Sequence, residues 1–482
     1  MTATVFVASA LMGAGKTRGF IEKINPEDNI ILAVPTIKLG DDIVIAMEKA
    51  GVNYEVFNSK NNHLGSTNSR IEKALIEGRE GCVLIITQKS LTMLNTEHLA
   101  GWTVVCDEVP NLSNCKISRR TPLNTYERLF NGLIQDHYDG RVTVKDGVFD
   151  SMLYAKLQDS LVSGIEVETI IFSGLLERKA EVKLEMSEKS FIVTVADFYD
   201  YTNIIESCLS FHVLGNSVEK SLFYKFVKAK GFNIKESEFT PGHFKYKASV
   251  TLLPLFNTER ISRDLLERNE DGSKSIIFDE SCLGWKGIKK AIEHHKGEPL
   301  LLQCFDWMKK FPFQDYENVT VTAFDSRGLN EYRDTHYRTV NIYHGNPNPI
   351  QARLDIKMLA MMGVDIEIGK AAIEHERFIE PMAQHIARTS IRNGNREDDI
   401  VVVLPTINVA EKIQEVLQID CKIDPSIMLN IPEKAPTQSK INIAKRDQRI
   451  RDLLSKKHTH KEISDIVGCS TKTVQRVQKK VA

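Results

Sequence analysis

Short apolar runs alternate with amphipathic stretches along the N-terminal part of the chain. A run of about five apolar residues has the length of a buried strand, and each of these runs ends in a turn before a polar, helix-like stretch. The runs occupy residues 4–8, 29–34, 82–86 and 102–106. Strands that alternate with helices predict a doubly wound parallel sheet whose strand ends share one edge. We expect a further strand at 167–176, VETIIFSGLL.

The same alternation resumes after a polar stretch, RNEDGSK, at residues 268–274. Strand candidates with helical stretches between them predict a second α/β domain. They lie at 274–281, 299–305, 319–326, 337–344 and 399–406.

The turn after the first strand carries a phosphate-binding pattern, ALMGAGKT. Glycines let backbone N–H groups approach a phosphate, the lysine reaches the outer phosphates, and the threonine hydroxyl holds Mg²⁺. The pattern therefore predicts ATP and Mg²⁺ as cofactors. The nucleotide-binding residues are Ala10, Leu11, Met12, Gly13, Ala14, Gly15, Lys16 and Thr17.

An acidic pair, Asp107 and Glu108, follows the strand at 102–106. Ligands of open α/β sheets bind at the carboxyl ends of the strands, where such a pair emerges. We expect Asp107 to hold Mg²⁺ together with Thr17, and Glu108 to act as the catalytic base.

Four segments in order, the phosphate-binding loop, Pro35-Thr36, Thr87-Gln88 and Asp107-Glu108, resemble motifs I, Ia, Ib and II of superfamily-two helicases. The resemblance implies RecA-like domains and contacts from Pro35, Thr36 and Thr87 to the nucleic-acid backbone. An ordinary turn at a strand end is an equally good reading of these three residues. Ser173-Gly174 resembles motif III loosely.

Two later segments resemble motifs V and VI of the same family. SRGLNEY, residues 326–332, places Gly328 and Asn330 where the family contacts nucleotide and nucleic acid. Gln384, Arg388 and Arg392 recur every four residues and share one face of a predicted helix. Arginines inserted from a second domain stabilise charge on the γ-phosphate during transfer. A solvated helix face is the alternative.

The C-terminal residues change in composition after a Pro-containing linker. From Lys440 onward the chain has an excess of about eight positive charges. Its periodicity predicts three helices with Ile463, Ile466, Val467, Val474 and Val477 on the apolar face, which is typical of a helix-turn-helix. The last helix would contact DNA through Thr471, Lys472, Thr473, Gln475 and Arg476. A helical protein-docking tail is the alternative.

The predicted fold is therefore two RecA-like parallel-sheet α/β domains, an inserted segment and a small all-α helix-turn-helix domain. The domains are expected at 1–186 and 274–429, with a connecting segment at 187–273 that carries no motif. A linker at 430–441 precedes the C-terminal domain at 442–482.

Composition and charge say more about the protein's surroundings than about the reaction that it catalyses. The chain has 482 residues, 42% of them hydrophobic, and a net charge of −1, so nucleic acid must bind to local patches. No apolar run reaches the length of about 18 residues needed to span a bilayer, and we expect a cytoplasmic protein. Eight cysteines without a C-x-x-C pair indicate reduced thiols.

These patterns favour an ATP-dependent DNA helicase or translocase. The resemblance extends to replication helicases and origin-binding proteins of large DNA viruses and tailed phages, and it implies a role in DNA replication or recombination. The expected partners are single-stranded, forked or origin-like duplex DNA and possible replication proteins. The alternatives are an AAA+-like initiator or regulator, a packaging ATPase, and a DNA-binding protein with a degenerate nucleotide site.

Overall fold

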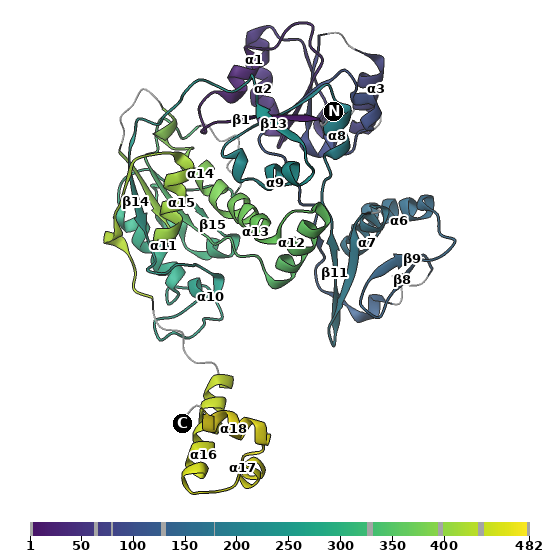
Figure 1. Ribbon diagram of the computed structural model, residues 1–482. Coiled ribbons are helices and arrows are strands. Elements are labelled where there is room, and N and C mark those ends of the chain that lie inside the picture. The colour runs from purple at the N-terminus through teal and green to yellow at the C-terminus, as the bar shows by residue number, and fades with distance from the viewer. Residues whose placement is uncertain are drawn as a thin grey trace.

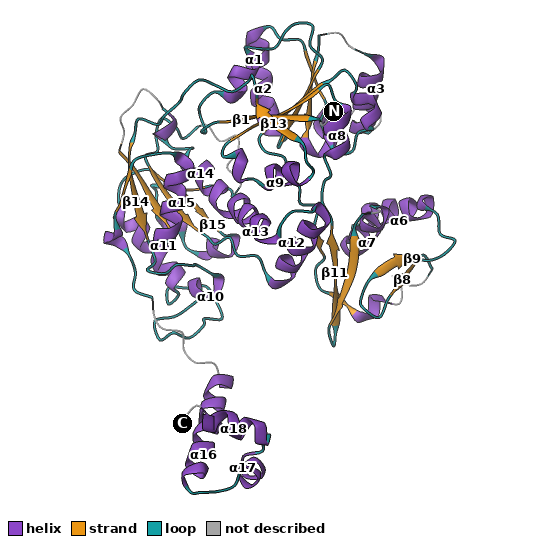
Figure 2. Ribbon diagram, viewed as in Figure 1, coloured by secondary structure: helices purple, strands orange, loops and turns teal. Residues whose placement is uncertain are grey.

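A computed structural model describes residues 3–61, 66–78, 81–126, 132–177, 179–324, 331–393, 399–431 and 438–479. Two parallel sheets form the upper and left parts of the molecule in Figure 1, an inserted domain lies to the right, and the C-terminal helices lie below. Helices cover both faces of each parallel sheet (Figure 2), as strands buried on both faces require.

The first sheet has seven strands among the described residues, in the order β13-β1-β12-β5-β2-β4-β3, and all its pairs are parallel. Four strands were predicted: β1 (Thr4–Ser9), β2 (Ile30–Val34), β4 (Val83–Thr87) and β5 (Thr103–Asp107). The others are β3 (Tyr54–Val56), β12 (Ser210–Gly215) and β13 (Asn233–Glu236). The flanking helices are α1 (Lys16–Ile21), α2 (Ile37–Ala50), α3 (Thr67–Glu77), α4 (Gln88–Leu91), α8 (Thr202–Ser207) and α9 (Leu222–Ala229).

The expected boundary at residue 186 is wrong, because the sheet takes two strands from the segment 187–273. β12 lies between β1 and β5. Phe211, Val213 and Leu214 are buried in it. The aromatic residues of this segment pack inside the first lobe, where Phe211 and Phe223 are stacked with ring centroids 5.9 Å apart.

A separate domain is inserted between β5 and β12. Its sheet is antiparallel in the order β10-β11-β6, β7 pairs with β11, and a β8-β9 hairpin lies beside it. The strands are β6 (Lys116–Ile117), β7 (Thr121–Pro122), β8 (Ile134–Asp136), β9 (Val142–Val144), β10 (Glu181–Met186) and β11 (Ser190–Ala196). The helices are α6 (Asp150–Ser163) and α7 (Glu166–Leu176).

The strand expected at 167–176 is wrong, since these residues form α7. Val167, Ile170, Ile171, Phe172 and Gly174 are its buried positions, and the spacing of 167, 170, 171 and 174 follows a helical period. Gly174 lies against Val182 and Val195 of the antiparallel sheet. The motif III resemblance of Ser173-Gly174 is lost with the strand.

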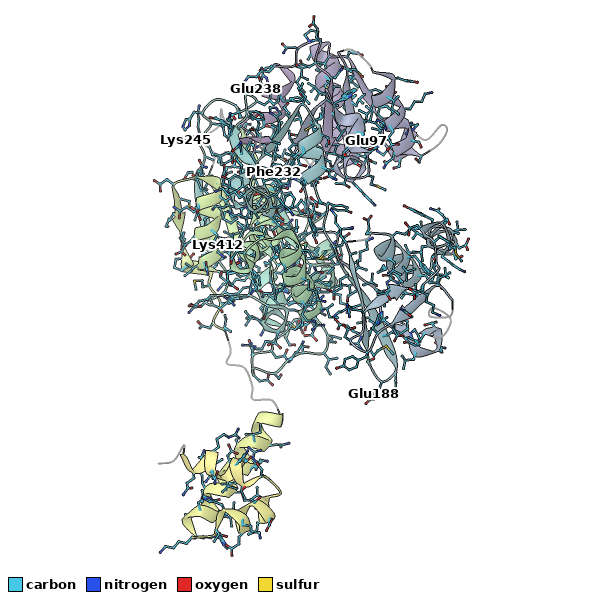
Figure 3. The ribbon with its side chains drawn as sticks, turned by 45° about the vertical axis from the view of Figure 1, so that its right-hand side comes forward. Glu97, Glu188, Phe232, Glu238, Lys245 and Lys412 are labelled. Atoms are coloured by element: carbon cyan, nitrogen blue, oxygen red, sulfur yellow. The ribbon has the colours of Figure 1, made fainter. Side chains whose placement is uncertain are left out.

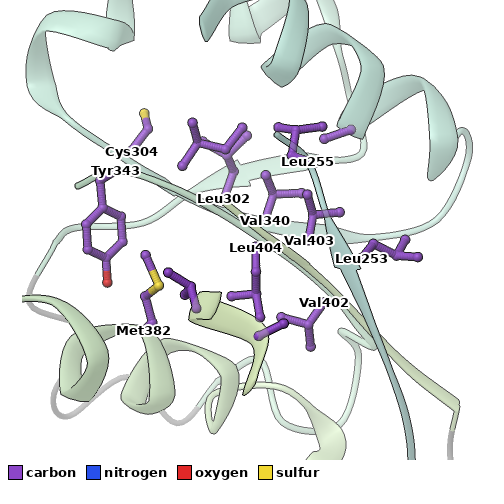
Figure 4. Packing of buried hydrophobic residues seen from close by; sticks show 14 of the residues in the cluster. Leu253, Leu255, Leu302, Cys304, Val340, Tyr343, Met382, Val402, Val403 and Leu404 are labelled. Atoms are coloured by element: carbon purple, nitrogen blue, oxygen red, sulfur yellow. The ribbon is translucent and has the colours of Figure 1, made fainter. Parts of the chain in front are cut away.

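The second sheet has six strands in the described part of the chain, in the order β16-β15-β17-β18-β14-β19, again all parallel. They are β14 (Ser249–Pro254), β15 (Leu300–Cys304), β16 (Val319–Val321), β17 (Arg338–Ile342), β18 (Asp399–Leu404) and β19 (Cys421–Ile423). The helices are α10 (Arg263–Leu266), α11 (Leu283–His294), α12 (Pro349–Met362), α13 (Ile366–Glu374), α14 (Glu380–Ile386) and α15 (Ile407–Leu417). Figure 4 shows the buried side chains along this sheet, including Leu302, Val340 and Val402.

The second lobe begins at β14, so the boundary expected at residue 274 is also wrong. Residues 274–281 form no strand, because Ile276 is fully exposed and Ile277 is 60% exposed. With these corrections the chain has two RecA-like α/β domains. Met358 and Leu359 of α12 are buried in the apolar core of the first lobe, and α12 also contacts β11 of the inserted domain.

The C-terminal residues form three described helices, α16 (Gln438–Ser455), α17 (His460–Val467) and α18 (Thr471–Lys479). Ile450, Ile463, Val474 and Val477 make their small core. Ile466 was expected in this core but is 45% exposed. α16 starts at Gln438, inside the expected linker. Figure 3 shows this unit apart from the lobes. Among the described residues, no helix has the length and apolar character needed to cross a membrane.

Candidate nucleotide site between the two lobes

The phosphate-binding loop joins β1 to α1 with two left-handed glycines. Gly13 has φ 87° and Gly15 has φ 84°, which residues with a Cβ rarely adopt. The N–H of Ala10 donates to the carbonyl of Gly215 at the end of the neighbouring strand β12, at 3.0 Å. The loop is thereby attached to the sheet and turns Lys16 and Thr17 toward the strand ends.

Lys16 is held by the loop itself. Its Nζ donates to the carbonyl oxygens of Ala10 at 2.7 Å and Leu11 at 3.1 Å. Burial lowers the pKa of Lys16, while Glu108 and Asp107 oppose this shift. The ammonium group is therefore bound to neutral carbonyls and is available to a phosphate.

Thr17 and Asp107, the pair expected to hold Mg²⁺, are hydrogen-bonded to each other. Thr17 Oγ1 donates to Asp107 Oδ1 at 3.0 Å and lies 3.2 Å from Oδ2. Burial raises the pKa of Asp107 to about 7; Glu108 adds to the shift and the bond from Thr17 opposes it. A hydroxyl and a carboxylate are the oxygen ligands that Mg²⁺ accepts alongside phosphate, so the donor set fits this ion.

Glu108 adopts a backbone conformation that is costly for a residue with a side chain. Its φ is 93°. Its N–H donates to Leu214 O at 2.8 Å, and Gln88 Nε2 donates to its carbonyl at 2.9 Å. Strain of this kind persists where surrounding bonds fix it, often at functional sites. The side chain lines a cavity of about 720 Å³ between the lobes.

Arg392 reaches this site from the second lobe. A Cβ atom at Gly13 would lie 3.1 Å from Nε of Arg392, so the guanidinium stem packs directly on the phosphate-binding loop. Tyr246, in the segment that leads into β14 and packs against the core of the second lobe, donates its hydroxyl to Met12 O at 2.7 Å. Burial lowers the pKa of Arg392, and Tyr246 and Glu108 oppose the shift.

The shared helix face expected for Gln384, Arg388 and Arg392 is wrong. α14 ends at Ile386, and Arg392 lies in a separate 3-10 turn, Ser390–Arg392. The extended backbone at Thr389 (ψ 179°) separates the two, and its hydroxyl caps the turn. Gln384 remains on α14 and lines the same cavity as Glu108.

Two polar side chains of the site are absent from the expected set, Asn216 and Glu380. Asn216 follows β12 and donates to Glu380 Oε2 at 3.0 Å, while Gln384 donates to Oε1 at 3.2 Å. Asn216 therefore lies at the strand end where we expected Ser173. The apolar run before Gly215-Asn216 is the sequence signal for this strand.

The expected nucleic-acid contacts of the first lobe lie on the same sheet edge as Glu108. Pro35 and Thr36 follow β2, and Thr87 ends β4. Thr36 Oγ1 accepts from Leu39 N at 3.2 Å, and Thr87 Oγ1 accepts from Ser90 N at 3.1 Å. Both hydroxyls cap helices, which is the role that an ordinary strand-end turn gives them.

The remaining expected residues fall into two groups. Gly328 and Asn330 lie outside the described residues. On α18, Thr471, Lys472, Gln475 and Arg476 are exposed and Thr473 is half-buried.

No protein-family model matches the chain, and no curated protein matches it. Among solved structures, the chain is similar to an XPD helicase, with a TM-score of 0.49, 10% identity and coverage of 88% of this chain and 96% of that one. It is also similar to S. tokodaii Xpd4, with a TM-score of 0.45, 11% identity and coverage of 88% and 96%. S. cerevisiae Dbp5 bound to RNA and ADP BeF3 gives a TM-score of 0.36 at 11% identity, with coverage of 88% and 86%.

Proposed function

We propose that the chain is an ATP-driven DNA helicase or translocase of the superfamily-two kind. The observation that carries the proposal is the packing of Arg392 from the second lobe on Gly13 of the first. A nucleotide bound at this loop would contact both lobes, so that hydrolysis changes how they are held together. Such coupling is what a two-lobed motor requires.

Each residue has a distinct part in the proposed reaction. Lys16 exchanges its carbonyl partners for the outer phosphates. Thr17 and Asp107 would hold Mg²⁺, which supplies charge neutralisation when bound. Glu108 accepts a proton from the attacking water, and Arg392 stabilises the charge that develops on the transferred phosphoryl group.

DNA is the proposed track because of the C-terminal helices. α17 ends at a left-handed Gly468, and α18 begins after Ser470, a spacing typical of a helix-turn-helix. Its exposed face presents Lys472, Gln475 and Arg476. We propose that this unit binds an origin-like or forked duplex while Pro35, Thr36 and Thr87 contact a single strand, in DNA replication or recombination.

A strand-displacement assay tests the proposal. A forked duplex with a fluorophore and a quencher on opposite strands should separate with ATP and Mg²⁺, but not with a non-hydrolysable analogue. Glu108→Gln protein is the matched control, because it should retain the fold and the main-chain hydrogen bonds of residue 108.

The same reaction with streptavidin on the DNA end distinguishes unwinding from translocation. Displacement of streptavidin without strand separation would identify a translocase. If ATP produces neither displacement nor strand separation, the proposed function is wrong.

A further inference from the structure

Glu380, the first residue of α14, connects the two lobes beside the proposed nucleotide site. Its Oε2 accepts a hydrogen bond from Asn216 of the first lobe at 3.0 Å. Its Oε1 accepts one from Gln384, one turn later on its own helix, at 3.2 Å. The Glu380 carboxylate therefore accepts hydrogen bonds from two side-chain amides, one in each lobe.

The surroundings of Glu380 place it close to the reacting groups. Burial raises its pKa to about 7, Glu108 adds to the shift, and Lys16 is among the groups that oppose it. His375 Nε2 lies 3.7 Å from Oε2, and burial lowers the pKa of His375 to about 4, so the imidazole is neutral. Glu380 therefore interacts with the charged groups of the candidate site, Glu108 and Lys16, and with Glu376.

In its ionised form, the Glu380 carboxylate determines how the Gln384 amide is turned. A carboxylate accepts hydrogen bonds and has none to donate, so the amide must direct its NH₂ group toward Glu380. The amide oxygen is then left as an acceptor. Gln384, Glu380, Asn216 and Glu108 all line the cavity of about 720 Å³, which has room for water.

We propose that Glu380 is a positioning residue for ATP hydrolysis, fixing Gln384 so that the amide oxygen and Glu108 together hold the attacking water. The inference rests on the proposed function. The bond from Gln384 lies within α14, whereas the bond from Asn216 forms only when the lobes are together. The water site also needs Glu108 of the first lobe, so we infer that it is complete only at the closed interface.

Steady-state kinetics of Glu380→Gln test this role. Glutamine replaces one of the two carboxylate oxygens by an NH₂ group, so either Asn216 or Gln384 loses its acceptor and faces another donor. We expect kcat for ATP to fall about ten- to hundredfold while KM changes by less than about twofold, because a displaced catalytic group affects the reacting geometry more than nucleotide binding. Glu380→Asp, which keeps the charge but withdraws it from both amides, should also lower kcat.

Glu376→Gln is the matched control. Glu376 lies one turn earlier, is half-buried and also connects the lobes, accepting from Leu222 N at 2.7 Å. A glutamine oxygen retains that bond, so kcat should stay within about twofold of the unmodified chain. Equal losses in Glu376→Gln and Glu380→Gln would show that only the interface matters, and would overturn the inference.

A double-mutant cycle shows whether Glu380 acts through Gln384. On a Gln384→Ala background, Glu380→Gln should lower kcat by less than about twofold, because the group that it positions is already absent. A full, independent loss on this background would overturn the inference, as would unchanged kcat in Glu380→Gln and Glu380→Asp. Failure of the unmodified chain to hydrolyse ATP is a separate result, and it would overturn the proposed function together with the inference.

Discussion

At the residue scale, the charged side chains of the candidate site bind neutral polar groups of the protein. Lys16 binds two carbonyls, Thr17 binds Asp107, and Glu380 binds two amides. Each of these bonds satisfies a polar group that lies in a half-buried or buried position. The groups are consequently held close to where a nucleotide would need them.

Removing the proposed base should abolish turnover without unfolding the chain. In Glu108→Gln the backbone at φ 93° keeps its bond to Leu214 O and the bond that it accepts from Gln88, since both involve main-chain atoms of residue 108. We expect kcat to fall by about 10² to 10⁴-fold, the usual contribution of a general base. The thermal unfolding midpoint should remain unchanged. Near-normal turnover would exclude Glu108 as the base.

Arg392 should act on the transition state rather than on binding. Arg392→Ala is expected to lower kcat by about 10³-fold, the scale of an arginine finger, with a small change in the Kd for nucleotide. Arg392→Lys should not restore the rate, because a lysine lacks the planar fork of donors. Normal hydrolysis by Arg392→Ala would mean that the contact with Gly13 is only structural.

Buried carboxyls predict that the nucleotide-free chain loses stability as the pH rises. The pKa values of Asp107, Glu376 and Glu380 are raised to about 7 from ordinary values of 3.8 and 4.5. The folded state therefore binds protons that the unfolded state releases. This stabilisation is complete below the ordinary pKa values and is lost as the pH rises through about 7.

Glu376→Gln should flatten this dependence, because glutamine does not ionise. We expect its unfolding midpoint to fall less than that of the unmodified chain between about pH 5.5 and about pH 8, a difference of about 2 kcal/mol in unfolding free energy. Thermal melts without nucleotide measure it. Parallel pH profiles for the two proteins would contradict the raised pKa of Glu376.

At the scale of elements, short apolar runs predict strands correctly in most places. The prediction is wrong where an apolar run belongs to a buried helix. The runs at 29–34 and 82–86 are buried strands, as expected. The run at 167–176 carries Glu168, Thr169 and Ser173 among its apolar residues, and the spacing of its buried positions 167, 170, 171 and 174 belongs to a helix. The sequence does not predict β12, because the polar residue His212 interrupts its apolar run. His212 is nevertheless buried within this strand.

Patterns of apolar and polar residues along the sequence do not predict contacts between distant elements. Asn216 and Glu380 are 164 residues apart, and neither has a sequence neighbour that indicates the other. Lys16 and Thr17 were predictable because their local loop defines their chemistry. The partners of that loop in the second lobe depend on how the lobes face each other.

The C-terminal helices should provide recognition without being needed for hydrolysis. Deletion of residues 438–482 removes a unit with its own core of Ile450, Ile463, Val474 and Val477. ATP hydrolysis stimulated by generic single strands should persist, while preference for a selected duplex over a scrambled one should be lost.

Two exposed residues of α18 should differ in their effects on binding. Gln475→Ala should relax preference at one base position by about 1 to 3 kcal/mol, whereas Arg476→Ala should weaken all sequences and lower the salt slope by about one. Binding titrations across a salt series measure both. Equal discrimination by the truncated protein would mean that these helices dock to another protein.

At the scale of the whole molecule, the second lobe is attached to the first at several places. Met358 and Leu359 of α12 enter the core of the first lobe. Arg353 of α12 pairs with Glu185 of the inserted domain at 2.6 Å, and Tyr246 binds Met12 in the phosphate-binding loop. The repeated strand pattern predicts two sheets, but these attachments set the lobes face to face across the candidate site.

Steady-state ATP hydrolysis by the intact chain is the measurement that tests the two-lobed motor most directly. It should be run with Mg²⁺ alone and then with single-stranded DNA, forked DNA, duplex DNA or RNA, for the unmodified and Arg392→Ala proteins. We predict hydrolysis that single-stranded or forked DNA stimulates, and loss of most of that activity in Arg392→Ala. Absence of hydrolysis under every condition, or equal rates for the two proteins, would contradict the account.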